Sequence, residues 1–319
     1  MDTTPTREER LEGGLLGLLV GDALGVPYEF KRPEELPAYE AIEMAPPKGY
    51  FCYNSNIPHG TWSDDGAEAL CLFTSLMDCG GVELEDFGQR LLAWMNGGYM
   101  AVDGHPFDIG MQTSQALTYY KAGVAAEDSG PRGERHNGNG SLMRVLPLAL
   151  LWEGSDEGLV EAAHKQSLIT HGHPRSLICC ALYCLWAKLE LEGVADAWEL
   201  ATEKLRKIYT DTPLFLKELN ENVCPEKCPV AYGQGYVVSC LHTARAACLE
   251  KDYESIVKKA ILFGYDTDTS ACVAGGIAGI RHGVHGIPER WWKALRGKEI
   301  VVPLIKKWLP DSGKSASMA

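Results

Sequence analysis

Apolar residues recur at steps of three and four along most of the chain, and this periodicity constrains the fold more than any other feature. After a polar start, for example, Leu70, Phe73 and Met77 fall on one face of a helix. Short alternating runs of β-branched residues, which are typical of strands, are nearly absent. We therefore expect an all-α fold, with further helices over residues 85–95, 112–120, 141–151, 159–168, 177–191, 197–208, 235–249, 255–263 and 268–282.

Two of these helical segments, residues 13–17 and 271–279, are unusually rich in glycine and alanine. Glycine costs about 1 kcal/mol relative to alanine in a helix interior. Its repeated use therefore indicates helices that pack backbone against backbone in a dense core. We expect long loops over 32–59, 121–139 and 210–230, and such loops often carry function.

No segment has the composition of a linker between domains. The hydrophobic fraction of 45% and the charged fraction of 23% are normal for a globular protein with a sizeable core. We expect one compact domain of orthogonally packed helices over 1–311, followed by a flexible tail over 312–319.

The formal charge of −13 argues against nucleic acid as a partner, because binding a polyanion requires an excess of Lys and Arg. We expect neither a signal peptide nor a membrane span, since residues 1–10 are polar and no apolar run approaches about 20 residues. The eleven cysteines are best explained as reduced thiols of a cytoplasmic protein. Cys224 and Cys228 could bind zinc, but no second pair stands at a matching spacing, so an ordinary loop is favoured.

Two short turns carry paired carboxylates directly before a helix: 62–65 (Trp-Ser-Asp-Asp) and 266–269 (Asp-Thr-Asp-Thr). Ser, Thr and Asp are also ordinary N-cap residues, so one such turn alone would indicate capping. Two turns of the same form, each followed by a small-residue helix, favour a shared site. Four carboxylates in one pocket repel each other unless cations neutralise them, and hard oxygen donors prefer Mg²⁺ or Mn²⁺ to zinc.

A glycine-rich segment, 137–141 (Asn-Gly-Asn-Gly-Ser), precedes another expected helix. Such a turn exposes backbone N–H groups and the positive end of a helix dipole, which suit a phosphate. A plain Asn-Gly turn would look the same, and the Lys of a P-loop is missing. Arg144, one turn into the helix, could pair with a phosphate or with the acidic turns. In the turn 170–174 we interpret His171 as a substrate contact and His173 as structural.

Together with 21–25 (Gly-Asp-Ala-Leu-Gly), these motifs make the chain similar to a known family. In order they are 21–25, 62–65, 137–141, 170–174 and 266–269, and five ordered matches make chance similarity improbable. The chain resembles the ADP-ribosylglycohydrolases, which include the dinitrogenase reductase-activating glycohydrolases and the eukaryotic ADP-ribosyl-acceptor hydrolases. The resemblance runs from Gly13 to about Gly283.

This resemblance implies a compact helical domain around two divalent cations, Mg²⁺ or Mn²⁺. It implies hydrolysis of the glycosidic bond in ADP-ribosylated proteins, with ADP-ribosyl-arginine as the first expectation and serine-linked, poly- or O-acetyl-ADP-ribose as alternatives. The implied catalytic residues are Glu29, Asp64 and Asp65. The implied metal ligands are Ser63, Asp64, Asp65, Asp266, Asp268 and Thr269. The implied substrate-binding residues are Asp108, Gly138, Asn139, Gly140, Ser141, Leu142, Met143, Arg144 and His171.

The chain departs from the family pattern at two positions. Family members often have Thr at the position of Ser63, which keeps the hydroxyl, and many have Thr at the position of Gly66, which leaves the local geometry open. Three other functions remain open. The chain could be an immunity protein that reverses, or through residues 1–10 or 32–59 occludes, an ADP-ribosyltransferase toxin. It could be an inactive scaffold, although both acidic turns are retained, or a metal phosphohydrolase that releases AMP.

Overall fold

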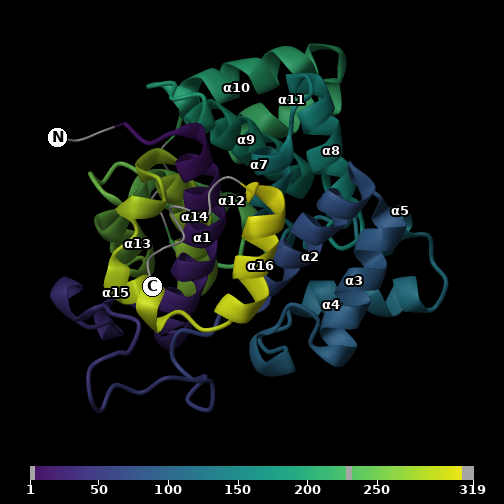
Figure 1. Ribbon diagram of the computed structural model, residues 1–319. Coiled ribbons are helices and arrows are strands. Elements are labelled where there is room, and N and C mark those ends of the chain that lie inside the picture. Colours follow the sequence, from purple (N-terminus) through teal and green to yellow (C-terminus); the bar gives the residue numbers. More distant parts are fainter. Residues whose placement is uncertain (1–3, 228–231, 311–319) are drawn as a thin grey trace.

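The computed structural model describes residues 4–227 and 232–310, and within them the expectation of an all-α fold is confirmed (Figure 1). In this part of the chain the β pairing is limited to an isolated antiparallel bridge between Gly138 and Tyr236. Buried apolar side chains form a core cluster that extends from Leu11 to Ile305. The α-helices are α1 (Arg7–Gly25), α2 (Asp64–Cys79), α3 (Leu84–Gly97), α4 (Met111–Lys121), α5 (Ala126–Ser129), α6 (Gly140–Met143), α7 (Leu146–Leu151), α8 (Asp156–Leu168), α9 (Pro174–Leu191), α10 (Ala197–Ile208), α11 (Pro213–Glu218), α12 (Val237–Ala247), α13 (Tyr253–Ile261), α14 (Thr267–His282), α15 (Glu289–Ala294) and α16 (Lys298–Trp308).

Helices α1 and α14 lie side by side and antiparallel in the interior of the molecule (Figure 1). Along α1 a glycine recurs at every fourth residue, at positions 13, 17, 21 and 25. A Cβ on Gly17 would lie 2.4 Å from the carbonyl oxygen of Gly275, and a Cβ on Gly21 would lie 2.2 Å from that of Ala271. Side chains cannot fit at such distances, so glycine lets the two backbones touch. The expected backbone-to-backbone packing is confirmed.

The C-terminal end of α1 brings the two acidic turns together. A Cβ on Gly25 would lie 2.3 Å from the Cα of Asp268, and Thr267 Oγ1 donates a hydrogen bond to the Gly25 carbonyl at 2.8 Å. One turn earlier, the Asp22 carboxylate accepts from the backbone N–H of Ser63 at 3.0 Å and of Gly66 at 2.8 Å. The starts of α2 and α14 are therefore both attached to the same end of α1.

Several expected boundaries are wrong. The single helix expected over 141–151 is two short helices, α6 and α7, separated at Arg144 and Val145. Pro147 stands in the first turn of α7, where a residue without an N–H is tolerated, and it could not have continued the preceding helix. The expected loops 121–139 and 210–230 contain α5 and α11, and α15 and α16 lie outside the expected ranges.

In the N-terminal segment α1 begins at Arg7 and is capped by a reciprocal pair between Thr6 and Glu9. The ten cysteines in the described part of the chain are free thiols. Cys228 and the expected tail over 312–319 fall outside the described residues. Over 4–227 and 232–310, no helix combines the length and apolarity needed to cross a membrane.

Candidate active site

The two acidic turns meet in space and enclose a cluster of carboxylates, which we call the acidic cluster. Its oxygens form two groups, each with all members within 4.8 Å of one another. Asp268 belongs to both groups, which is the arrangement that a carboxylate bridging two cations would require. The first group is Asp22, Asp65 and Asp268, and the second is Glu29, Asp266 and Asp268.

The hydrogen bonds of the cluster leave carboxylate oxygens for a cation. Ser63 Oγ donates to Asp65 Oδ2 at 2.9 Å, and Thr269 Oγ1 lies 3.4 Å from the same oxygen. Asp65 Oδ1 and Asp268 Oδ2 are buried without a hydrogen-bond partner among the described residues. Unpartnered buried carboxylate oxygens around a shared Asp268 fit two hard divalent cations, for which oxygen is the preferred donor.

Burial also makes the negative charges of the cluster costly. Desolvation raises the pKa of Asp22 to about 7 and, together with the charge of Asp108, raises that of Glu29 to about 11. Desolvation followed by repulsion from neighbouring carboxylates raises the pKa values of Asp65 and Asp268 well above their usual range. Bound cations would offset both causes, so the electrostatics of the site agree with its donor set.

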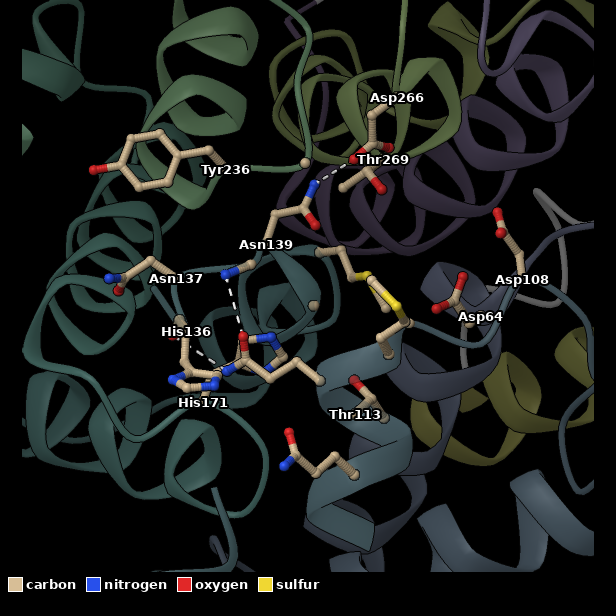
Figure 2. Close-up of a pocket in the computed structure, with 18 of the residues that line it drawn as sticks. Asp64, Asp108, Thr113, His136, Asn137, Asn139, His171, Tyr236, Asp266 and Thr269 are labelled. Carbon is tan, nitrogen blue, oxygen red and sulfur yellow. Dashed lines mark hydrogen bonds between the residues drawn. The ribbon is translucent and has the colours of Figure 1, made fainter. Parts of the chain in front are cut away.

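The acidic cluster lies at one end of a cavity of about 920 Å³, a size typical of small-molecule sites. Figure 2 shows Asp64 and Asp108 on one side of this cavity and His136, Asn137 and Tyr236 on the opposite side. We call these the acidic end and the amide end. The two are joined by Asn139, whose Nδ2 donates to Asp266 Oδ2 at 2.9 Å (Figure 2).

The amide end is held together by backbone pairing. Asn139 N–H donates to the Gly235 carbonyl at 3.0 Å, and Val237 N–H donates to the Asn137 carbonyl at 2.9 Å. Gln112 Nε2 spans the carbonyls of His136 and Thr170 at 3.2 and 3.1 Å. The expectation of free N–H groups therefore fails for Asn139, whose N–H is already engaged.

Arg144 corrects a further expectation, because it pairs neither with the acidic cluster nor with the cavity. Its guanidinium is fully buried, donates to Glu68 Oε2 at 2.6 Å and to Thr170 Oγ1 at 2.7 Å, and stacks on Phe87. Thr170 Oγ1 also lies 2.8 Å from His171 Nδ1. The Thr170 hydroxyl can donate its proton to Nδ1 while it accepts from Arg144, an arrangement that would place the His171 proton on Nε2. Arg144 is thus linked to the cavity through Thr170 and His171.

His171 itself is placed for the expected contact. It lines the cavity, and its Nε2 lies close to the segment 138–140. Burial holds its pKa well below the usual range, so the ring is neutral. With its proton on Nε2, this neutral ring would donate a hydrogen bond towards the segment 138–140.

Most of the expected site residues either line the cavity or lie in the wall behind it, while Ser63, Asp65 and Asp268 are buried in the acidic turns and do not line it. The cavity is lined by Glu29, Asp64, Asp108, Gly138, Asn139, Gly140, Met143, His171, Asp266 and Thr269. Ser141, Leu142 and Arg144 are fully buried in the wall behind it. Asp64 lines the cavity but belongs to neither group of the acidic cluster.

Sequence reasoning missed Asp22 as a ligand candidate and Tyr236 as part of the cavity wall. Asp22 lies within a helix of glycine and apolar residues, and a carboxylate there has to be buried, which was a usable signal. No sequence signal marked Tyr236, because its place in the cavity wall depends on the bridge to Gly138.

Comparisons with known proteins point to one family. The ADP-ribosylglycohydrolase family model matches residues 3–316. The ADP-ribosylarginine hydrolase Tri1 of Pseudomonas putida (strain GB-1) is 28% identical over 286 residues, which are 89% of this chain and 73% of that protein. The ADP-ribosyl-[dinitrogen reductase] glycohydrolase of Rhodospirillum rubrum is 26% identical, with 92% of each chain covered. A solved ADP-ribosylglycohydrolase-related protein complex has a TM-score of 0.70 and 29% identity, covering 94% of this chain and 96% of that one.

Proposed function

Since the chain belongs to the ADP-ribosylglycohydrolase family, a family of hydrolytic enzymes, we propose that it removes ADP-ribose from arginine side chains of modified proteins. The observation that carries the proposal is the acidic cluster, shared between two helix starts, at one end of a cavity sized for a small ligand. Two relatives, both named ADP-ribosylarginine hydrolase Tri1, support the choice of linkage.

We further propose that the acidic cluster holds two divalent cations, Mg²⁺ or Mn²⁺. The residues for this role are Asp22, Asp65, Asp266 and Asp268, with Glu29 at the edge of the second group. Ser63 and Thr269 would orient Asp65 through their hydroxyls. Cations bound there would supply positive charge that orients the ribose hydroxyls and a water molecule.

The reaction breaks the bond between the anomeric carbon of ribose and the guanidine nitrogen. The oxygen of a water molecule bonds to that carbon, and the departing nitrogen takes up a proton. Charge of the oxocarbenium type develops on the ribose, and buried carboxylates stabilise it. Glu29 is the proton carrier that we assign, because its carboxyl lines the cavity and Asn54 Nδ2 holds its Oε2 at 3.2 Å. Asp64 and Asp65 are the remaining catalytic candidates.

The amide end would bind the rest of ADP-ribose. His171 Nε2 and the side chain of Asn139 offer neutral donors, and the half-exposed ring of Tyr236 offers a flat surface for the base. These groups, with Glu134 and Arg135 beside them in the lining, would orient a ligand, and the acidic end would then receive the scissile bond.

The test compares peptides that carry ADP-ribose on arginine or on serine, each with Mg²⁺, with Mn²⁺ and with a chelator. We expect intact ADP-ribose from the arginine peptide only when a metal ion is present. Release from the serine peptide alone would overturn the linkage. Release of AMP would indicate a phosphohydrolase, and full activity in chelator would remove the metal role.

The setting is also part of the proposal. Free thiols among the described cysteines support a reducing, cytoplasmic environment. Reversal of a toxin's modification would use the same chemistry as the proposed reaction. Occlusion of a toxin has less support. One of its two candidate segments is residues 1–10, and residues 7–10 of that segment are part of helix α1. A metal-site variant that still neutralised a toxin would establish occlusion.

A further inference from the structure

Three aromatic side chains form a continuous exposed surface, which we call the aromatic rim: Phe30, Phe51 and Tyr53. They are 52%, 63% and 58% exposed. The ring of Tyr53 meets those of Phe30 and Phe51 edge to face, each at 5.4 Å between centroids. Lys31 Nζ lies 4.6 Å from the centre of the Phe51 ring and 5.1 Å from that of Tyr53. Contiguous exposed rings of this kind are typical of interaction surfaces.

The aromatic rim is continuous with the acidic end of the cavity. Phe30 and Glu29 both line the cavity. At the other side of the rim, Asn54 follows Tyr53 directly and donates its side-chain hydrogen bond to Glu29 Oε2 at 3.2 Å. A molecule that contacts the rim therefore lies beside the carboxyl group assigned to proton transfer.

The backbone holds Phe30, the rim residue that lines the cavity, in a defined conformation. Phe30 has a φ of 61° and Tyr265 also has a φ of 61°, the left-handed region that residues other than glycine rarely adopt. Phe30 N–H donates to the Tyr265 carbonyl, and Tyr265 N–H donates to the Lys31 carbonyl, each at 2.6 Å. An unfavourable conformation persists only where the surroundings enforce it, and such positions cluster at functional sites.

The orientation of ADP-ribose in the cavity then indicates which part of the substrate contacts the aromatic rim. In the proposed function, ADP-ribose fills the cavity with its base at the amide end and its scissile bond at the acidic end. The modified side chain leaves the cavity past Glu29 and Phe30, so the polypeptide that bears it has to lie outside, over this edge. We infer that the aromatic rim is the docking surface for the polypeptide flanking the modified arginine. Its rings suit apolar side chains and the faces of further guanidinium groups.

This inference rests on the proposed function, and it makes a distinction that the cavity alone does not. A small substrate, ADP-ribosyl-arginine, fills the cavity without reaching far beyond it. A protein mono-ADP-ribosylated on a surface arginine contacts the cavity and the rim. Only the second substrate should depend on Phe51 and Tyr53, neither of which lines the cavity.

The experiment measures kcat and KM for both substrates with the Mg²⁺-loaded wild type and the double variant Phe51→Ser, Tyr53→Ser. The matched control is Leu214→Ser on α11, a side chain that is 63% exposed and does not line the cavity. For the protein substrate we expect kcat/KM of the double variant to fall about tenfold or more through KM, as for the loss of aromatic anchors at an interface. For ADP-ribosyl-arginine we expect both constants to stay within about twofold, and Leu214→Ser should match the wild type.

Equal losses on the two substrates would overturn the inference, because the rim would then act on the acidic end or on folding. Unchanged constants on both would overturn it too. The affinities of the same variants for the modified protein and for free ADP-ribose, measured by fluorescence anisotropy, keep the inference separate from the proposed reaction. If the wild type hydrolysed neither substrate, the proposed function would fail. The docking role of the rim would still be supported if the double variant bound the modified protein more weakly than the wild type and bound free ADP-ribose equally well.

Discussion

The acidic end and the amide end of the cavity differ in how their polar groups are satisfied. At the amide end, Asn139 pairs through its backbone with Gly235 and through its side chain with Asp266, and His171 Nδ1 is paired with Thr170. At the acidic end, buried oxygens of Asp65 and Asp268 have no hydrogen-bond partner among the described residues, and burial raises the pKa values of both groups. At the amide end the unpartnered buried atom is a ring nitrogen, His136 Nδ1, whereas at the acidic end the unpartnered atoms belong to neighbouring carboxylates that could hold a metal ion.

The largest effect should come from removing the charge of Asp268, the carboxylate that both groups of the acidic cluster share. Asp268→Asn keeps the shape of the side chain and removes its charge. We expect turnover to fall on the order of 1000-fold, since stabilisation of transition-state charge is lost, and metal binding to weaken in titration calorimetry. Asp128→Asn is the control, because that carboxylate is exposed and pairs only with exposed Arg132. Near-normal turnover with unchanged metal binding would contradict the role of the cluster.

Variants of Arg144 test whether this buried side chain contributes to the stability of the fold or contacts the substrate directly. Arg144→Met leaves the fully buried carboxylate of Glu68 without its cation, so we expect a loss of about 3 kcal/mol in the free energy of unfolding. Adding Glu68→Leu should restore most of that stability, because both charges are then gone. Denaturant unfolding measures both variants. A large rise in KM for ADP-ribose compounds at unchanged stability would instead indicate a direct substrate contact.

Asp22 at the acidic end should make the metal-free protein less stable as the pH rises, whereas the depressed pKa values of the buried His164 and His171 act in the opposite direction. Burial raises the pKa of Asp22 from 3.8 to about 7, so the folded state holds a proton that the unfolded state releases. Stability is therefore greatest below the unfolded pKa and is lost as the pH rises towards 7, by about 2 kcal/mol from Asp22 between pH 5 and pH 7. Unfolding of the wild type and of Asp22→Asn in chelator at both pH values isolates this loss as the difference between the two proteins. With Mg²⁺ bound, which competes with the proton, the loss should shrink or reverse.

The sequence predicted the acidic end better than the amide end for a physical reason. Paired aspartates before a helix are local patterns, and their charge implies a cation wherever they meet. Asp22 shows the limit, because its place in the cluster depends on α1 ending against α2 and α14.

The amide end depends on contacts between segments far apart in the chain. Tyr236 reaches the cavity through its bridge to Gly138, and Arg144 turns inward because Glu68 on α2 offers a buried partner. Neither contact has a local pattern. The helix break before α7 did have one, in Pro147, but the apolar periodicity on both sides of it hid the signal.

The link between the fold and the acidic end can be broken without touching a carboxylate. Gly25→Ala would place a Cβ 2.3 Å from the Cα of Asp268, so α14 has to move away from α1. We expect a loss of about 2 kcal/mol in unfolding free energy and weaker Mg²⁺ binding. Gly81→Ala is the control, since nothing lies within 4 Å of a Cβ at that position. Thermal unfolding with and without Mg²⁺ measures both effects, and a Gly25→Ala protein with normal metal binding would show that the contact does not set the cluster.

The smallest effect is expected at the amide end, where a single ring contributes to binding only. Tyr236 lines the cavity, and its hydroxyl accepts from Arg175 Nη1 at 3.2 Å, which holds the ring in place. Tyr236→Leu removes the flat surface proposed for the base and should raise KM about tenfold with kcat nearly unchanged. Tyr236→Phe keeps the ring and should stay close to wild type, which separates stacking from the hydroxyl contact. A fall in kcat equal to that of an acidic-end variant would mean that the two ends do not divide binding from chemistry.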